Sequence, residues 1–148
     1  MTQKPYAIQH AQDCGDERGN MHVLSAGKEL PFAVKRAFYM QRSTDTAVRG
    51  NHANLYATLA FVCLCGTCRL SIDDGGQIYN LTLGDPAQTV IVQPRTWKKL
   101  DHFSADCILL VLSDRLYEED DILKDYDAFV RLCAAPHTER AERNKKAF

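Results

Sequence analysis

Short segments in which apolar and polar residues alternate recur along most of this chain, and turn residues separate them roughly every ten positions. This spacing predicts an all-β sandwich or barrel. Two connections read as tight turns, Asp73-Asp74-Gly75-Gly76 and Gly84-Asp85-Pro86. The segment Arg42–Asn51 is longer, more polar and less predictable. The predicted strands are Met21–Ser25, Ala33–Met40, Leu59–Cys65, Thr67–Ile72, Ile78–Leu83, Thr89–Val92, Trp97–His102 and Cys107–Leu112.

The last third of the chain changes character. The acidic run Glu118–Asp121 predicts a helix start, because the helix macrodipole favours acids at its N-terminus. Apolar residues at spacings of three and four then predict an amphipathic helix packed on the barrel, which Pro136 ends. These residues are Ile122, Leu123, Tyr126, Phe129, Val130 and Cys133. We therefore expect a single domain over residues 1–136 and a charged, flexible tail over residues 137–148.

Composition narrows the function classes. The chain has 148 residues, and 18 Lys and Arg against 19 Asp and Glu give a net charge of -1. A chain without a basic excess is not expected to bind nucleic acid, although a few local arginines suit a small anionic ligand. The start, Met1–Tyr6, lacks the apolar stretch of a signal peptide, and no apolar run approaches the ~18 residues of a membrane span. We expect a cytoplasmic protein with no membrane partner.

Six cysteines raise the question of a metal site or disulfides: Cys14, Cys63, Cys65, Cys68, Cys107 and Cys133. Without a secretion signal we expect reduced thiols. The run Cys63–Cys68 resembles a metal-ligand spacing, but no second CxxC or His pair completes a zinc set. Side-chain alternation puts Cys63 and Cys65 on one face of their predicted strand. A packing role is therefore favoured, because free Cys behaves as a small buried hydrophobe.

The segment Arg49-Gly50-Asn51-His52-Ala53-Asn54 carries the candidate chemistry. A Gly-x-His-x-polar step that runs into a strand resembles the way a cupin barrel places polar side chains in its mouth. Metal-binding cupins offer two histidines, a carboxylate and a later histidine. Here those positions hold His52, Asn54, Thr58-Leu59 and Lys98, and a lysine would repel a cation. We expect no metal.

The remaining polar residues suit proton transfer next to a carbonyl. His52 has an ordinary pKa near 6.5 and can exchange a proton at neutral pH, while Lys98 or Arg49 can stabilise a developing enediolate oxygen. Each residue also has a structural alternative. His52 could be held within a loop, Arg49 could form a surface ion pair, and Lys98 could lie on a solvated face. Trp97 is expected in the barrel core, and Tyr39 either in the core or in the site.

Taken in order, these segments resemble the nucleotide-sugar 3,4-ketoisomerases, the WxcM-like cupins. The resemblance covers most of the chain, and no piece carries it alone. It rests on Asp16–Gly19, Leu30–Tyr39, Arg49–Asn54, Gly66–Arg69, Asp73–Gly75, Pro94–Lys98, Phe103–Cys107 and Tyr126–Phe129.

The resemblance implies an all-β cupin, a double-stranded β-helix (jelly-roll) barrel with a C-terminal helix. It implies a homodimer with an exchanged N-terminal strand, and no metal or cofactor. It also implies conversion of a dTDP-4-keto-6-deoxyhexose to its 3-keto isomer, in deoxysugar and surface polysaccharide (lipopolysaccharide) biosynthesis. The usual family motif is Arg-Gly-x-His-Ala-His, so Asn54 replaces the second histidine. Leu59 replaces a common Gln, and Lys98 a common His or Arg.

The resemblance also suggests roles for individual residues. His52 would remove the proton at C3, Arg49 and Lys98 would stabilise the enediolate, and Tyr39 would move a proton between oxygens. The proton would return at C4 from His52 or from a water held by Asn54. The diphosphate would bind Arg18 and Arg36, because guanidinium groups suit phosphate oxygens. Asn51 and Trp97 complete the predicted substrate contacts.

Two alternatives stay open because the second histidine is absent. The chain could be an epimerase acting on the same substrate class. It could also be a non-catalytic cupin that binds a nucleotide sugar.

Overall fold

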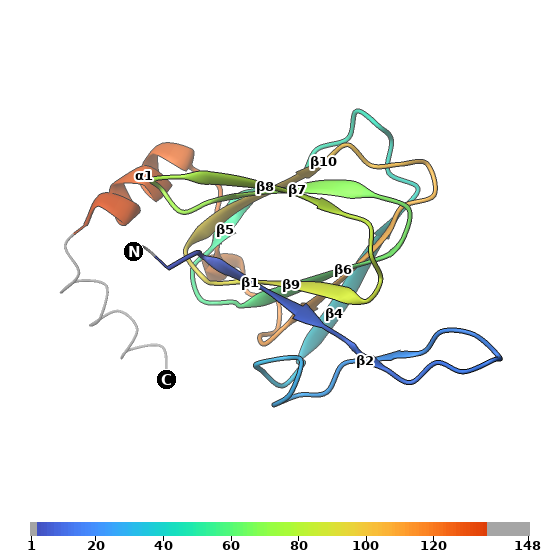
Figure 1. The fold of residues 1–148 in the computed structure, drawn as a ribbon. Helices are drawn as coiled ribbons and strands as arrows, with labels where there is room; N and C mark the ends of the chain where they lie inside the picture. The colour runs from blue at the N-terminus through green and yellow to red at the C-terminus, as the bar shows by residue number, and fades with distance from the viewer. Residues whose placement is uncertain (1–2, 136–148) are drawn as a thin grey trace.

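Two antiparallel five-stranded sheets face each other around an apolar interior in the computed structural model, which describes residues 3–135 (Figure 1). The β2–β3 hairpin projects from this barrel, and α1 (Tyr126–Ala134) covers one end of the second sheet. The order in the first sheet is β1 (Tyr6–His10), β9 (Gln88–Val92), β6 (Leu59–Cys65), β11 (Ile108–Ser113) and β4 (Arg36–Gln41). The order in the second is β12 (Ile122–Leu123), β5 (Arg49–Asn54), β10 (Thr96–Asp101), β7 (Cys68–Asp73) and β8 (Ile78–Leu83). The hairpin pairs β2 (Gln12–Asp13) with β3 (His22–Val23).

The expected all-β jelly-roll with a C-terminal helix is confirmed, because the burial of the strands follows the alternation that predicted them. In β7, Leu70 and Ile72 are buried between the sheets, whereas Arg69 and Ser71 are half-buried on the outer face. A side-chain period of two thus supplies each sheet with one apolar inner face. The interior cluster includes Leu59, Phe61, Cys63, Cys68, Leu70, Ile72, Val90, Val92, Leu100, Leu109 and Val111.

Eight strands lie where the pattern placed them, and β6 and β8 have the predicted bounds. The pattern missed β1, the short β2 and β12, and above all β5. The less predictable segment Arg42–Asn51 includes the start of β5, which begins at Arg49. Its sequence contains Gly50 and Asn51 with positive φ, so the alternation that marks a strand is interrupted.

The predicted helix start is wrong. Residues Glu119–Asp121 form one 3-10 turn, β12 then pairs with β5, and the helix begins only at Tyr126. Asp125 caps it, since its side chain accepts a hydrogen bond from the Ala128 N–H at 3.1 Å. The helix ends at Ala134, and Ala135 is extended, as expected of a residue before a proline.

The predicted tail, residues 137–148, and the boundary at residue 136 lie outside the described residues. None of the helices within residues 3–135 is long and apolar enough to cross a membrane.

Both predicted turns are confirmed. Asp73 Oδ1 accepts from the Gly75 N–H at 2.7 Å, and Asp85 Oδ1 accepts from the Ala87 N–H at 2.9 Å. The shared face expected for Cys63 and Cys65 is wrong: Cys63 is buried and Cys65 is exposed. The register explains this, because Leu109 pairs with Cys63 while Ile108 pairs with Cys65, so Leu64 is an extra residue and the strand bulges.

Helix α1 docks through Phe129, whose side chain is 0% exposed. Phe129 packs with Ala53 and Trp97 on the outer face of the second sheet. The ring centroids of Trp97 and Phe129 lie 5.6 Å apart. Tyr126 adds a hydrogen bond from its hydroxyl to Asp73 Oδ2 at 2.7 Å.

Replacing Phe129 with Ala is expected to lower the free energy of unfolding by about 3–4 kcal/mol, because it opens a cavity under the helix. Val130→Ala is the matched control, since Val130 is 40% exposed and its loss should cost less than about 1 kcal/mol. Urea denaturation followed by circular dichroism measures both. Equal losses in the two variants would contradict this account of helix docking.

Candidate active site

A β-bulge in β5 sets the geometry of the site. Lys98 of β10 pairs with His52, but Lys99 pairs with Gly50, so Asn51 is an extra residue on β5. Gly50 and Asn51 have φ values of 74° and 57°. A Cβ on Gly50 would also lie 3.1 Å from the Lys98 carbonyl oxygen, so this position suits glycine. The bulge places His52 directly opposite Lys98, with both side chains toward the interior.

A cavity of about 340 Å³ opens at this pair, between edge strand β4 and strands β5 and β10. We call it the main cavity. Its polar side chains are those of Tyr39, Arg49, His52 and Lys98, and its apolar wall is formed by side chains such as Phe61 and Leu100. A few convergent polar groups on a mostly apolar wall are typical of small-molecule sites. The complete lining is Phe38, Tyr39, Met40, Arg49, Gly50, His52, Leu59, Phe61, Lys98 and Leu100.

A second cavity of about 350 Å³ adjoins the first, and we call it the side cavity. The two share Phe38, His52 and Leu59 in their walls. The side cavity adds Arg36, whose guanidinium carbon lies 5.3 Å from the centre of the Phe38 ring and 5.6 Å from that of Tyr117. Asn54 and Ile122 complete the wall. His52 thus stands at the junction of the two cavities.

Burial tunes both bases of the facing pair. It lowers the pKa of Lys98 to about 7, because the buried ammonium loses its water while Asp121 only partly offsets that loss. Lys98 Nζ donates to the Thr96 carbonyl oxygen at 2.9 Å. The pKa of His52 is also lowered, chiefly by burial and further by the charge of Lys98, although a hydrogen bond with the Gly50 backbone opposes this. At neutral pH the imidazole is therefore mainly neutral and can accept a proton.

Asp121 organises the wall of the side cavity from the segment before β12. Its carboxylate accepts from Asn54 Nδ2 at 2.7 Å, from the Tyr56 N–H at 2.7 Å and from the Ala57 N–H at 3.2 Å. Because a carboxylate accepts hydrogen bonds, the Asn54 amide must turn its nitrogen to Asp121. Asn54 Oδ1 is buried and has no hydrogen-bond partner among the described residues. The oxygen is thus the Asn54 atom left to accept a hydrogen bond from a ligand.

A search of protein families matches residues 4–134 to the family described as "FdtA: WxcM-like, C-terminal". The chain belongs to this family. The TDP-4-oxo-6-deoxy-alpha-D-glucose-3,4-oxoisomerase of Aneurinibacillus thermoaerophilus is 35% identical to it over 125 residues, which are 84% of this chain and 90% of that protein.

Two solved structures give the same result. The TDP-fucose-3,4-ketoisomerase WlaRA of Campylobacter jejuni is 32% identical, with a TM-score of 0.84, over 87% of this chain and 96% of that one. A 3,4-ketoisomerase of Helicobacter canadensis is 28% identical, with a TM-score of 0.84, over 88% and 98%. The resemblance to the WxcM-like ketoisomerases is confirmed, and with it the expectation that the chain is an enzyme of the isomerase class.

The structure brings together six of the residues predicted for the site of this FdtA-family chain. Arg49, His52 and Lys98 line the main cavity, and Arg36 and Asn54 line the side cavity. Tyr39 borders the main cavity from β4, where its side chain is 67% exposed. Their roles toward a substrate stay predictions.

Three predicted residues lie elsewhere in the chain. Trp97 Nε1 donates to Asn51 Oδ1 at 3.2 Å on the outer face of the second sheet, and Trp97 packs under α1 rather than inside the barrel. Both residues line a different, outer groove. Arg18 sits on the projecting β2–β3 hairpin, where it is paired with Asp16 (Figure 1). Within one chain, Arg18 therefore does not reach the cavities.

Sequence reasoning missed Asp121 and Tyr117. Asp121 belongs to an acidic run that suggested a helix start, and its partner Asn54 is 67 positions away. No local pattern shows such a contact. An aspartate followed directly by the apolar pair Ile122-Leu123 was the one available signal for a short strand with a buried acid beside it.

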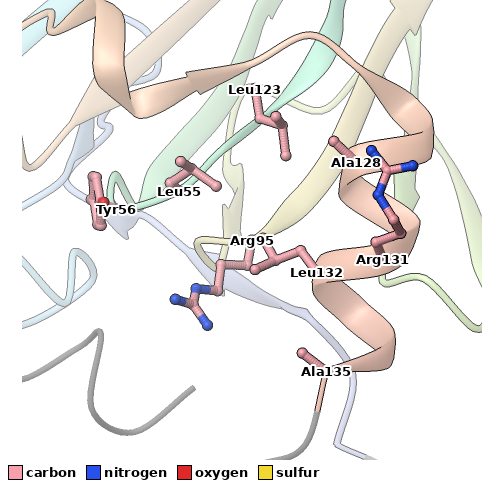
Figure 2. Close-up of a pocket in the computed structure, with 8 residues that line it drawn as sticks. All are labelled: Leu55, Tyr56, Arg95, Leu123, Ala128, Arg131, Leu132 and Ala135. Carbon is pink, nitrogen blue, oxygen red and sulfur yellow. The ribbon is translucent and has the colours of Figure 1, made fainter. Parts of the chain in front are cut away.

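A further pocket, of about 440 Å³, lies between α1 and the chain after β5 (Figure 2). It shares no lining residue with the two cavities. Leu55, Leu123 and Leu132 give it an apolar wall. The guanidinium groups of Arg95 and Arg131 point away from each other in Figure 2, so they do not converge on a common anion. We assign it no part in the chemistry.

Replacing Lys98 with Met is expected to raise the free energy of unfolding at pH 6 by about 1–3 kcal/mol, because it removes a buried ammonium. The gain should shrink as pH rises from about 7 toward the ordinary lysine pKa of 10.5. Over that window the unfolded wild type binds a proton that the folded protein does not, so wild-type stability rises with pH. Urea denaturation across pH 6–10 measures the difference.

The control for this experiment is Lys99→Met. Lys99 is half-buried, and its Nζ lies 3.6 Å from Asp101 Oδ2, so its loss should change stability by less than about 1 kcal/mol at every pH. If the gain in the free energy of unfolding of the Lys98→Met variant did not depend on pH, burial of the ammonium would not be what destabilises the wild type.

Proposed function

We propose that this chain converts a dTDP-4-keto-6-deoxyhexose to its 3-keto isomer by proton transfer through an enediolate. The observation that carries the proposal is the facing pair of His52 and Lys98 at the junction of two cavities. Their depressed pKa values put a neutral base beside a group that can hold or release a proton near neutrality. Arg36 and Arg49 add fixed positive charge for an anionic substrate.

The proposed first step is removal of the C3 proton by His52. The C–H electron pair forms a C3–C4 double bond, and the C4 carbonyl oxygen becomes an enediolate oxygen. Lys98 and Arg49 line the same cavity and would stabilise that oxygen, which is where positive charge lowers the barrier most. Arg36 suits a phosphate oxygen in the side cavity, because its guanidinium is positioned by two aromatic rings.

The second step moves the ketone. Tyr39 borders the main cavity and is proposed to pass a proton from the C3 oxygen to the C4 oxygen. The proton held by His52 exchanges with solvent, C4 then receives a proton from His52, and the C3–O bond becomes the new carbonyl. Asn54, with its amide nitrogen held by Asp121, would accept a hydrogen bond from a sugar hydroxyl and orient the ring.

Replacing His52 with Asn is expected to lower turnover by at least about 100-fold, because the base is removed while the cavity keeps its shape. Proton NMR with dTDP-4-keto-6-deoxyglucose in deuterated water measures it: the wild type should give a 3-keto sugar with deuterium at C4. Calorimetry should show that the variant still binds the nucleotide sugar. His102→Asn, at an exposed position beyond β10, is the control. Substantial turnover in the His52→Asn variant would contradict the assignment of His52 as the base.

The same spectra separate the two alternatives that Asn54 leaves open. Deuterium at C3 of the wild-type product without movement of the ketone would indicate an epimerase. Binding without any exchange would indicate a cupin that has lost this chemistry. The facing pair favours proton transfer over binding alone, because a histidine base and a lysine with a pKa of about 7 can exchange protons at neutral pH.

Replacing Asp121 with Asn is expected to move the acid limb of the kcat/KM profile to lower pH, by about half to one unit. The charge of Asp121 raises the pKa of His52, so its removal lowers that pKa further, and the base stays neutral to lower pH. Asp120→Asn is the control, because Asp120 is exposed. A limb that stays in place or moves to higher pH would contradict this role, whereas a purely structural role would lower activity equally at every pH.

We further propose a homodimer in the cytoplasm that supplies deoxysugars for surface polysaccharides. Strand β4 is a sheet edge, and exposed apolar side chains lie on it and just before it, among them Phe38 and Val34. Such an edge suits pairing with another chain. An exchanged N-terminal segment would also bring Arg18 of a second copy toward a site that Arg18 does not reach within its own chain.

A further inference from the structure

Three cysteine side chains meet inside the barrel, although they are far apart in the sequence. The sulfur atoms of Cys63, Cys68 and Cys107 all lie within 4.8 Å of one another, and those of Cys63 and Cys107 are 3.9 Å apart. Each residue is 2% exposed or less. Among residues 3–135, this is the one group of three potential metal ligands that lie so close together. We call it the thiol cluster.

The thiol cluster lies at the end of the barrel where two connections meet. Cys63 and Cys68 flank the β6–β7 turn, and Cys107 precedes β11. The turn is tied to the β10–β11 loop, because the Thr67 N–H donates to Ser104 Oγ at 2.9 Å and the Ser104 N–H donates to the Thr67 carbonyl at 2.9 Å. No cysteine of the cluster lines the main or the side cavity. The cluster is thus separate from the proposed catalytic site and lies where the β6–β7 turn meets the β10–β11 loop.

The three residues are free thiols. Cys63 Sγ donates weakly to the carbonyl oxygens of Cys65 at 3.3 Å and Gly66 at 3.4 Å. Burial and the neighbouring sulfurs raise the pKa of Cys63 to about 12 and raise that of Cys68 as well. The surroundings therefore disfavour negative charge on sulfur.

We propose that Cys63, Cys68 and Cys107 form a binding site for a thiophilic trivalent metalloid, with arsenite as the test ligand. Soft sulfur donors select soft ions, and three sulfurs at this spacing can close on one central atom after small side-chain rotations. The reaction is a ligand exchange without oxidation or reduction. Arsenous acid, As(OH)3, and three thiols give As(SR)3 and three waters, so three As–O and three S–H bonds break while three As–S and three O–H bonds form.

Charge decides between this occupant and a divalent ion. Three thiolates around a divalent ion leave a net negative charge, and an unpaired charge in an apolar interior is expensive. The trivalent adduct is neutral. A zinc site would also need a fourth ligand, and no histidine, carboxylate or further cysteine among the described residues lies within reach of all three sulfurs.

The test is arsenite binding by the full chain, kept reduced with a phosphine because dithiols bind arsenic themselves. Native mass spectrometry should show one added arsenic less three hydrogens, and X-ray absorption at the arsenic edge should show three sulfur neighbours. Cys68→Ser and Cys107→Ser should weaken binding by more than the 10- to 100-fold that changes around a metal site usually cost. Cys65→Ser is the matched control, since Cys65 is exposed on the same turn.

The wild-type absorption spectrum tests the proposal even if a serine variant fails to fold, and circular dichroism identifies such a failure. Oxygen neighbours, or fewer than three sulfurs, would overturn the site. Loss of arsenite binding in the Cys65→Ser variant would overturn the assignment of Cys63, Cys68 and Cys107 as the ligands. If the protein bound Cd²⁺ through three sulfurs but did not bind arsenite, the charge argument that selects the metalloid would be overturned.

Discussion

The buried carboxylate of Asp121 is the contact on which the site depends. It accepts hydrogen bonds from one side chain and two backbone groups of the chain around β5, and so joins the segment after β11 to the opposite sheet. Without it, the Tyr56 and Ala57 N–H groups and the Asn54 amide would be buried without partners, which proteins rarely tolerate. The same carboxylate is the anion that offsets the burial of His52 and Lys98. Asp121 therefore contributes both to the geometry of the side-cavity wall and to the charge that surrounds the two bases.

The buried bases His52 and Lys98 lower the stability of the barrel but give it groups that can transfer protons. Lys98 lies in an interior position that Leu or Ile would fill more favourably, and its ammonium meets a backbone carbonyl rather than a carboxylate. An energetically poor position is what brings its pKa near neutrality. Helix α1 packs through Phe129 against Trp97 on the outer face of strand β10. This contact buries apolar surface on the face opposite Lys98.

The sequence predicted the barrel because its strands bury one face, and burial of one face leaves an alternating pattern that can be read locally. Leu59–Cys65 and Ile78–Leu83 are examples. It also pointed to His52, Asn54 and Lys98, since a family motif fixes their spacing. It failed for β5, whose inner face is polar and whose alternation is broken by a bulge. It failed for Asp121 and for the meeting of Cys107 with Cys63, because contacts between distant segments leave no local trace.

The bulge at Gly50-Asn51 also constrains how this family can change. Arg49 and His52 are three positions apart, an odd separation that would put them on opposite faces of a regular strand. The extra residue restores a common face, and both line the main cavity. Loss of one residue here would point the Arg49 side chain away from the main cavity. The number of residues between Arg49 and His52 is therefore a geometric requirement of the site, as is the glycine at position 50.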